Sequence, residues 1–437
     1  MQMRHVIEYN GETAEFYIDF RDGKCLVLNV DSGVWKIYDN AILGLAADQE
    51  LSNNIKNTIC EDGLFYDTKE LECIPDTDKF ALLILEVTDA CNMKCDYCFE
   101  GKKEHCHTYM KTETACKAFE LFSQLNCSER IMVEFNGGEA LLNFDMIKSS
   151  VTQILEYAKN KKINVDFTLQ SNGTMLNKDI IDFLKRYDIP IGISMDGGEK
   201  YNIGRKLKNG DKVYPLLLDK ISMLKKQGKD FCTLSVVTKS GQYKDILGLQ
   251  KRIGNIECRI NLINKVGNGA DISLTSNEIS NIANDFLAFA KEVIHEKTLY
   301  EANLACYLMG LMLFNPFMCY KTPCGSGKNQ LYVKADGTVV ACQESCYINE
   351  GFIGNVSDMD IETLKQGIRK NEWINSTDKY KDREKCQKCQ WKKICHVCPA
   401  VMKVDETMCE FNKLVLPELV WLTGGNENEI LSYIQYK

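Results

Sequence analysis

Short apolar runs alternate with amphipathic segments between residues 81 and 296. The runs lie at residues 81–87, 131–135, 163–170, 189–196, 231–238 and 258–264, and they are rich in branched side chains. Their length and composition predict strands. The segments between them have helical periodicity, with Ala115, Ala118, Phe122 and Leu125 on one face and Ile147, Val151, Ile154 and Ala158 on another. The pattern therefore predicts six β–α units in succession.

This repetition predicts a parallel sheet with right-handed crossovers. Such a sheet is either open and doubly wound or curved like part of a barrel. In both cases the carboxyl ends of the strands meet at one edge, where active sites of α/β folds lie. We expect functional side chains in the loops that follow these strands.

The two ends of the chain have other patterns. Strand-like pieces at residues 15–20, 24–30 and 34–39 precede a segment, 41–65, that suggests two short helices. Beyond residue 300 a helical stretch leads into cysteine-dense loops and one hairpin, whose Asp336-Gly337 pair is a strong turn signal. We expect domains at residues 1–76, 80–298 and 299–437, the last ending in a helix.

Composition narrows the class of protein. The chain has 437 residues, 45% of them hydrophobic and 26% charged, which is typical of a globular protein of several domains. Its net charge of -8, with basic and acidic residues intermingled, predicts no nucleic-acid partner. Without an apolar signal region or an apolar stretch of 18 residues, we expect a cytoplasmic protein outside the membrane.

The chain contains 21 cysteines, which is a large number for a reducing compartment. Disulfides are rare there, so metal binding is the better interpretation of the grouped cysteines. Cys25, Cys60, Cys116 and Cys232 stand singly in apolar surroundings, and we expect them to be small buried hydrophobic residues.

Three cysteines, Cys91, Cys95 and Cys98, directly follow the first predicted strand. Iron–sulfur clusters normally have four thiolate ligands, so three from one loop leave one metal position open to a small molecule. A structural zinc site that borrows a distant fourth ligand is the alternative.

The context of this loop resembles the radical S-adenosylmethionine enzymes. The CxxxCxxC motif has an aromatic residue, Tyr97, before its last cysteine, and glycine-rich turns follow at residues 136–140, 170–174 and 193–198. Each turn alone is a weak signal. Their succession at the ends of three consecutive strands makes the resemblance specific.

The resemblance implies a ligand site and a mechanism. Gly137 and Gly138 would let the backbone approach the methionine amino group, assisted by Glu139, and Arg205 would lie near the carboxylate. The whole set implied for S-adenosylmethionine is Tyr97, Gly137, Gly138, Glu139, Ser171, Asn172, Ser194, Asp196 and Arg205, with Ser194 and Asp196 at the ribose. A reduced cluster would then donate one electron to the sulfonium, and the resulting 5'-deoxyadenosyl radical would abstract a substrate hydrogen. The family more often has proline where Ala140 follows the glutamate.

Eight of the ten cysteines beyond residue 300 would suffice for two further cubane clusters, although structural zinc is an alternative. Their order resembles the SPASM extension of radical enzymes. That resemblance implies one 4Fe-4S cluster on Cys319, Cys324, Cys342 and Cys398, and another on Cys386, Cys389, Cys395 and Cys409, which makes three clusters in all. Because only His396 and Val397 separate Cys395 from Cys398, one fewer residue than usual, Cys346 is an alternative ligand to Cys398.

Two features bear on the substrate. In anaerobic sulfatase-maturating enzymes, an aspartate base follows the cysteine that ends the hairpin, but here Gln343 follows Cys342, and an amide cannot take up that proton. The strands and helices of residues 1–76 resemble a small winged-helix-like, PqqD-like α+β module that binds a leader peptide by strand addition. A cap or dimerisation module is the alternative.

Together the resemblances imply an α/β partial (β/α)6 barrel of TIM type and a radical maturase of a ribosomally made precursor peptide with a leader. We expect a crosslink as product, first a thioether from cysteine sulfur to carbon, otherwise a carbon–carbon bond. A flavodoxin- or ferredoxin-type protein would supply electrons. The alternatives are a sulfatase-type protein maturase and, outside catalysis, an iron–sulfur electron carrier with all clusters closed.

Overall fold

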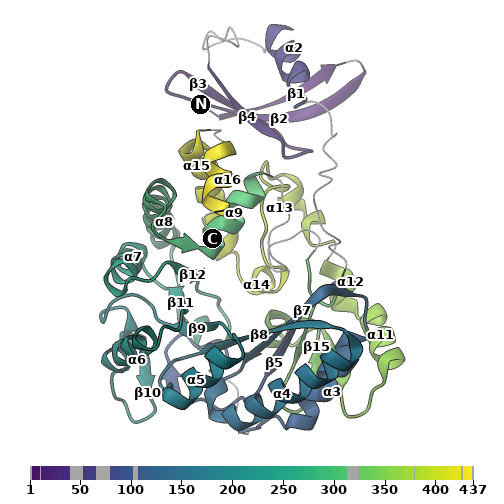
Figure 1. Ribbon diagram of the computed structural model, residues 1–437. Coiled ribbons are helices and arrows are strands. Elements are labelled where there is room, and N and C mark those ends of the chain that lie inside the picture. Colours follow the sequence, from purple (N-terminus) through teal and green to yellow (C-terminus); the bar gives the residue numbers. More distant parts are fainter. Residues whose placement is uncertain are drawn as a thin grey trace.

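The computed structural model places a small N-terminal sheet above a group of C-terminal helices, with a large sheet below them (Figure 1). It describes residues 2–9, 11–39, 53–64, 79–101, 107–312, 324–377, 379–424 and 427–435. Within these ranges, none of the helices combines the length and the apolar character needed to cross a bilayer.

The large sheet has ten strands in the order β13-β12-β11-β9-β8-β7-β5-β14-β15-β16. Its parallel part confirms all six predicted strands: β5 (Phe80–Glu86), β7 (Cys127–Asn136), β8 (Asn164–Ser171), β9 (Ile191–Ser194), β11 (Cys232–Val237) and β12 (Glu257–Leu262). Because neighbouring strands are parallel, the loops after them open at one edge of the sheet.

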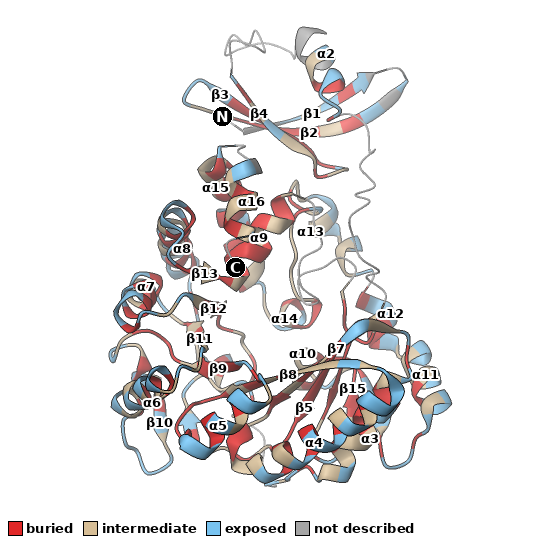
Figure 2. Cartoon of the chain, in the orientation of Figure 1, coloured by how far each residue is buried: buried red, intermediate tan, exposed pale blue. Residues whose placement is uncertain are grey.

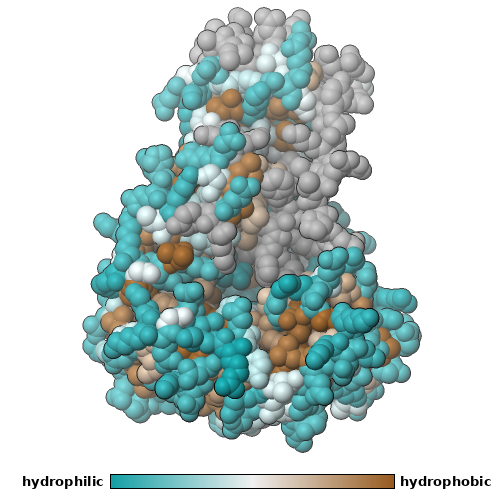
Figure 3. Space-filling model, viewed as in Figure 1, coloured by the Kyte–Doolittle hydropathy of each residue, from teal (hydrophilic) through white to brown (hydrophobic). Residues whose placement is uncertain are grey.

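Helices connect these strands and cover the sheet. They are α3 (Thr112–Ser123), α4 (Phe144–Lys161), α5 (Lys178–Arg186), α6 (Tyr214–Lys226), α7 (Gln242–Ile253) and α8 (Ser276–Glu296). The predicted apolar faces of α3 and α4 are buried in one core with Leu83 and Leu85 of β5. In Figure 2 the helices accordingly show buried residues toward the sheet and exposed residues outward. On the face seen in Figure 3 hydrophilic residues dominate the surface.

The predicted C-terminal hairpin is part of the same sheet. β14 (Gln330–Val333) pairs in parallel with β5, and β15 (Thr338–Val340) and β16 (Phe352–Asn355) continue the sheet antiparallel to it. The side chain of Glu86 fixes this junction, because its carboxylate accepts hydrogen bonds from the Tyr332 hydroxyl at 2.8 Å and the Ala335 amide at 3.1 Å. The sequence pattern predicted this hairpin, but we expected it to belong to a separate C-terminal domain.

The remaining elements lie mostly in the C-terminal segment. They are β6 (Met93–Cys95), β10 (Arg205–Leu207), β13 (Tyr300–Glu301), α9 (Ala302–Leu311), α10 (Gln343–Tyr347), α11 (Ile361–Lys370), α12 (Glu372–Thr377), α13 (Glu384–Gln387), α14 (Pro399–Val404), α15 (Thr407–Thr423) and α16 (Glu427–Ile434). Short 3-10 turns join several of them, at Ala140–Asn143, Asn202–Gly204, Gly267–Asp271 and Tyr380–Asp382.

The N-terminal module is a four-stranded antiparallel meander of β1 (Gln2–Tyr9), β2 (Glu12–Arg21), β3 (Lys24–Asn29) and β4 (Trp35–Asp39), followed by α2 (Asn53–Glu61). The three predicted strands are confirmed, and β1 is an additional strand that the sequence pattern did not reveal. The other predicted helix falls largely outside the described residues. The winged-helix-like, PqqD-like identity of this module stays a prediction.

This module is fastened to the C-terminal helices. Tyr17, Leu26, Leu28 and Val30 belong to one hydrophobic core with buried residues of α8, α9 and α15. Polar contacts add direction: the Trp35 indole donates to the Leu311 carbonyl at 2.7 Å, the Trp421 indole donates to Asp19 at 3.0 Å, and Arg21 makes a bidentate pair with Glu418 at 2.7 and 2.8 Å. A shared core of this kind holds the module in one orientation.

Glu301, at the outer strand of the large sheet, is fully buried and binds backbone amides. Its carboxylate accepts from Ile260 at 2.8 Å, Asn303 at 3.1 Å and Leu304 at 2.5 Å. Burial outweighs these bonds and raises the pKa of Glu301 to about 7. Since the folded-state pKa lies above the unfolded value of 4.5, the contribution of this group to stability is fully present below pH 4.5 and is lost as the pH rises through 7.

We predict that Glu301→Gln removes this pH dependence. Between pH 5 and pH 8, the wild type should lose up to about 3 kcal/mol of unfolding free energy relative to the variant. Thermal unfolding at both pH values measures the effect, and the difference between the two proteins cancels the titration of all other groups. An equal difference in midpoint at both pH values would contradict the assignment.

Candidate functional site

Cys91, Cys95 and Cys98 lie in the connection after β5, at the carboxyl edge of the sheet, and Cys95 ends the short strand β6 within this connection. Burial raises the pKa of the Cys91 thiol to about 11 and that of Cys98 to about 12, and each thiol also feels the charge of a neighbouring one. A buried thiol with a raised pKa ionises at neutral pH only when a metal or another cation compensates its charge. The loop thus holds three thiol groups close together, and each would ionise when a metal binds.

The predicted turn after β7 packs directly on this cysteine loop. The Gly138 amide donates to the Thr88 carbonyl at 2.9 Å, and the Glu139 amide donates to the Ala90 carbonyl at 2.8 Å. A Cβ atom on Gly137 would lie 2.2 Å from the Thr88 oxygen, and one on Gly138 would lie 2.4 Å from the Ala90 oxygen. Glycine is therefore required at both positions, because the backbone of this turn lies against the backbone of the cysteine loop. The contact of these glycines with a methionine amino group stays a prediction.

Glu139 joins the ends of β7 and β8. One carboxylate oxygen accepts from the Ser171 hydroxyl at 2.7 Å, and the other accepts from the Asn172 amide at 2.7 Å. The Asn172 side chain then donates to Asn92, inside the cysteine loop, at 2.8 Å. Burial raises the pKa of Glu139. Three predicted site residues are thus brought together beside the cysteines, where they brace the loop.

Tyr97, Asp196 and Arg205 form a buried polar cluster on the other side of the loop. Arg205 comes from β10, which pairs antiparallel with β6 so that Arg205 lies opposite Cys95. Its guanidinium donates to the Tyr97 hydroxyl at 2.9 Å and lies 3.9 Å from Asp196, and the Tyr97 hydroxyl donates to Asp196. The sequence-predicted Ser194 ends β9, two residues before Asp196.

One atom of this cluster indicates a missing ligand. Among the described residues, the buried Arg205 Nε has no hydrogen-bond partner. An unpaired guanidinium N–H in the interior is costly, and a carboxylate is its best partner. The carboxylate of an amino-acid ligand such as S-adenosylmethionine would satisfy it, so the residues present fit this cofactor.

A further loop, which the sequence analysis did not single out, clamps the cysteines from the side of β12. The Asn268 amide donates to the Cys98 carbonyl at 2.8 Å, and its side chain donates to the Cys95 carbonyl at 3.0 Å. Gly267 has a φ of +57°, and a Cβ atom there would lie 2.1 Å from the Phe99 carbonyl oxygen. The available signal was the glycine-rich turn at the end of the sixth strand, which repeats the pattern of the earlier turns.

Polar side chains also line the sheet beside the cysteine loop. Gln170 donates to Glu134 at 2.8 Å, and Asn136 donates to Gln343 at 3.2 Å. The bond from Asn136 joins helix α10 to the end of β7, and within α10 Gln343 donates to the Tyr347 hydroxyl at 3.1 Å. Burial raises the pKa of Glu134. No motif marks Glu134, which the sequence analysis missed.

The first predicted auxiliary set is described in part, because Cys319 lies outside the described residues. Cys398 feels the charges of Cys342 and Cys324, and burial raises its pKa well above the usual value. Cys346, the alternative ligand, packs instead in an apolar cluster with Leu82, Ile84, Tyr332 and Val340. Cys398 thus lies near two cysteines of its predicted set, and the choice between Cys398 and Cys346 stays a prediction.

The second predicted auxiliary set converges on one pocket. Cys386, Cys389, Cys395 and Cys409 all line it. The Asn412 amide lies 3.3 Å from the Cys395 sulfur and accepts from the Tyr307 hydroxyl at 2.6 Å. Hydrogen bonds of this kind orient cluster ligands and tune their potential. In the part of the chain that the structure describes, no group of three or more His, Cys, Asp or Glu side chains lies close enough together to hold a metal ion. The cysteine ligand sets of all three clusters therefore stay predictions.

Comparisons with known proteins agree with this geometry. Residues 85–252 match the model of the radical SAM superfamily, and residues 324–390 match the SPASM model, described as an iron–sulfur cluster-binding domain. The chain therefore contains a radical SAM domain and a SPASM domain, and the predicted resemblance is confirmed. These domains imply S-adenosylmethionine and iron–sulfur clusters as cofactors, while the number of clusters stays a prediction.

Two relatives illustrate the range of similarity. An uncharacterized protein of Methanocaldococcus jannaschii is 36% identical over 161 residues, which are 36% of this chain and 52% of that protein, so the chain spans about half of its length. The cysteine-type anaerobic sulfatase-maturating enzyme of Clostridium perfringens (strain 13 / Type A) is 25% identical over 72% of this chain and 87% of its own.

Solved structures share the fold. anSMEcpe with bound AdoMet has a TM-score of 0.66 at 20% identity, covering 80% of this chain and 100% of its own. Streptococcus suis SuiB bound to S-adenosylmethionine has a TM-score of 0.56 at 15% identity, covering 90% of this chain and 96% of its own. The α/β radical SAM fold with a SPASM domain is thus confirmed.

We predict that Gly138→Ala damages the cysteine loop. Its added methyl would collide with the Ala90 carbonyl, which is backbone and cannot move alone. The variant should lose about four irons per chain, one cubane, and bind S-adenosylmethionine at least about tenfold more weakly. Iron analysis and equilibrium dialysis measure both.

Gly248→Ala is the matched control, because a Cβ atom there meets no other atom within 4 Å. This exposed glycine lies within α7, where alanine is the better helix former, so the control should keep its iron. Equal iron content in both variants would show that the contact with Ala90 is dispensable.

A second pair of variants tests the auxiliary ligand. Cys398→Ala should lower the iron content and change the visible absorbance of the reconstituted protein, because one cubane loses a ligand. Cys346→Ala should keep both, at some cost in stability from the cavity left beside Tyr332. The reverse result would make Cys346 the ligand.

Proposed function

We propose that this enzyme matures a ribosomally made precursor peptide, using S-adenosylmethionine to start a crosslink between a cysteine sulfur and a carbon atom. The observation that carries the proposal is the buried Arg205 Nε, orphaned beside three cysteines at the carboxyl edge of the sheet. It marks a place for an amino-acid carboxylate within reach of a three-thiol loop. The proposal includes a cytoplasmic location and three 4Fe-4S clusters.

The residues would divide the work by their positions. Cys91, Cys95 and Cys98 would hold a cluster with one open iron, while Arg205 and Asp196 would orient the amino-acid and ribose parts of the cofactor. When bound, the cluster and S-adenosylmethionine supply a carbon radical able to abstract hydrogen. The chain itself braces the loop through Glu139 and Asn268 and keeps water out of a buried polar site.

The polar side chains beside the cysteine loop suit a peptide substrate. Glu134, Gln170, Asn136 and Gln343 offer carboxylate and amide groups next to the cysteine loop, and the buried Asn136 Oδ1 has no partner among the described residues. Such groups bind backbone amides, and they favour a polar, extended substrate. The auxiliary cysteines support the thioether in particular, because a cluster there could accept the electron released when the new bond forms.

Known structures support a peptide substrate by analogy. anSMEcpe was solved with AdoMet and a Kp18Cys peptide, and Streptococcus suis SuiB was solved with the precursor peptide SuiA; the latter aligns with 93% of this chain. The N-terminal sheet has β1 and β4 as its outer strands, and either edge could receive a leader peptide as an added strand. The firm attachment of this sheet to the C-terminal helices would hold the leader in a fixed position relative to the site.

Sulfatase-type maturation is the second candidate. It is favoured by the extent of the match to the Clostridium perfringens enzyme, which covers 87% of that protein. Against it stands Gln343, whose amide is engaged by Asn136 and Tyr347 and cannot act as a base. A carbon–carbon crosslink is the remaining enzymatic alternative.

The test uses the anoxically reconstituted protein with S-adenosylmethionine, dithionite and the peptide encoded beside its gene. We expect 5'-deoxyadenosine, a product lighter by two hydrogens, and one cysteine that no longer reacts with iodoacetamide. Cys91→Ala should abolish all three results, whereas Cys116→Ala, a change in helix α3, should leave them intact.

The outcomes separate the parts of the proposal. Deoxyadenosine without mass loss would refute the crosslink but keep the cofactor chemistry. A lighter product with a reactive cysteine would favour the carbon–carbon bond. If S-adenosylmethionine remains uncleaved in every reaction, the proposed function as a whole is refuted, and the electron carrier is the remaining interpretation.

A further inference from the structure

Cations gather around the second cysteine set, although the chain as a whole is acidic. Residues 379–393 contain seven Lys or Arg and two Asp or Glu, in a chain with a net charge of -8. Basic and acidic residues are intermingled here too, as at residues 381–385, but the basic ones are in excess. A local excess of positive charge in an acidic protein creates a field that attracts a negatively charged partner.

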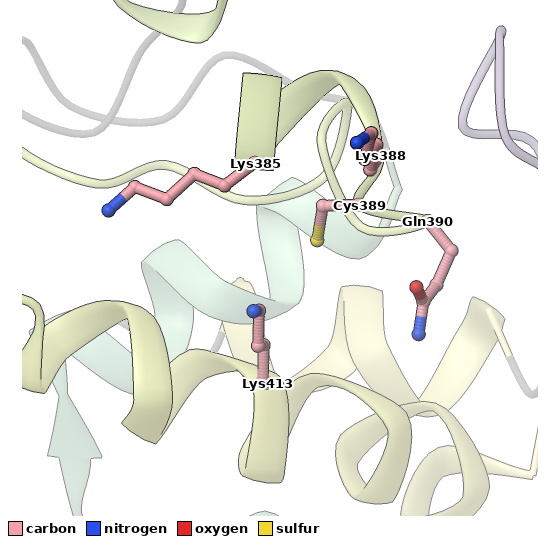
Figure 4. A pocket seen from close by; sticks show the side chains of 5 residues that line it. All are labelled: Lys385, Lys388, Cys389, Gln390 and Lys413. Carbon is pink, nitrogen blue, oxygen red and sulfur yellow. The ribbon is translucent and has the colours of Figure 1, made fainter. Parts of the chain in front are cut away.

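These cations surround an opening at the surface. Lys385, Lys388 and Lys413 line a pocket with Cys389 and Gln390, and the close view shows Lys413 of α15 pointing toward the loop that carries Cys389 (Figure 4). The adjoining pocket, lined by all four cysteines of the set, also includes Lys381, Arg383, Lys385, Lys392 and Lys413. The cationic rim and the cysteines thus belong to one surface region, which we call the lysine rim.

The carboxylates within reach do not neutralise this rim. Lys385 pairs with Glu406 and Lys388 pairs with Glu384, with side-chain exposures of 65% and 82% for the two glutamates. Such exposed pairs contribute little and exchange readily for another partner. Lys392 reaches Asp31 of the N-terminal module at 3.3 Å. Lys413 makes no ion pair with any described residue within 4 Å, so positive charge remains in excess.

We propose that the lysine rim is the docking surface of an acidic one-electron carrier protein. One electron would pass between the carrier and the iron–sulfur group held by Cys386, Cys389, Cys395 and Cys409, so that one partner is oxidised and the other reduced by one electron, with no bond formed or broken. The inference rests on the proposed function only in that these four cysteines hold such a group.

Two independent features select this partner. The sign of the rim selects acidic proteins, and steering by complementary charge is how carriers find their sites quickly. The cysteines select a redox partner, because they open to solvent at the same place where the charge gathers. Electron-transfer encounters bury little surface, so an open rim of this size suffices.

The experiment uses the reconstituted holoenzyme and purified bacterial flavodoxin as the probe. Association is measured by stopped-flow at low and at high salt, for the parent and for a variant with Lys385→Glu, Lys388→Glu and Lys413→Glu. We expect association to slow by at least about tenfold in this variant at low salt, and its salt dependence to flatten. A milder variant, Lys388→Gln with Lys413→Gln, should show an intermediate effect even if the triple variant loads its clusters poorly.

The matched control carries Lys159→Glu, Lys226→Glu and Lys244→Glu. These three lysines are exposed on α4, α6 and α7, so the change in net charge is the same at a different place. It should associate with flavodoxin almost as the parent does. Iron content and visible absorbance show whether each variant holds its clusters.

Three results would overturn the inference. The first is an equal rate of association with flavodoxin for the parent and the triple variant, and the second is an equally large decrease of this rate in the control variant. The third is competition by poly-L-glutamate as strong as that by flavodoxin, which would mean that the rim attracts any polyanion. Cofactor cleavage by the parent with dithionite is measured in parallel. If it occurs while the rim variant binds flavodoxin normally, this inference fails and the proposed function stands; if no cleavage occurs with any reductant, the proposed function fails.

Discussion

The structure depends on how the loop of Cys91, Cys95 and Cys98 is held. Backbone groups of the loop take part in many of its supporting contacts: the turn after β7 donates two amides to it, and Asn268 binds two of its carbonyls, one through its backbone amide and one through its side chain. The glycines at 137, 138 and 267 permit this because any Cβ atom would displace a carbonyl oxygen. A site built from backbone contacts keeps its side chains available for ligands, which suits the binding of a cluster with one open position.

The buried charged groups around this loop also leave a group available for a ligand. Arg205, Asp196 and Tyr97 bind one another, yet the arginine retains an unused N–H group among the described residues. Burying a guanidinium without full pairing reduces stability, and such a cost is usual where a ligand completes the arrangement. Glu139 differs, because both of its oxygens are engaged by the protein and it serves as a brace.

The three parts of the chain act as one body through shared packing. β14 extends the large sheet from β5, so the C-terminal segment that contains Cys342 is joined to the sheet whose first loop contains Cys91, Cys95 and Cys98. The N-terminal sheet shares a hydrophobic core with α15, and it also touches the cysteine loop of the C-terminal segment, where Tyr17 packs against Trp391 with ring centroids 5.8 Å apart. Recognition of a peptide, radical chemistry and electron exchange would therefore be linked by rigid contacts.

The sequence by itself determined the six parallel strands, the apolar faces of α3 and α4, the three-cysteine loop and the turns beside it. Local periodicity and the spacing of cysteines and glycines encode these features, because each depends on residues close together in the chain. Only the tertiary structure decided the pairing of β14 with β5, the docking of the N-terminal sheet, and the convergence of Lys413 with Lys385 on one rim. These depend on contacts between residues far apart in sequence, and no local pattern carries that information.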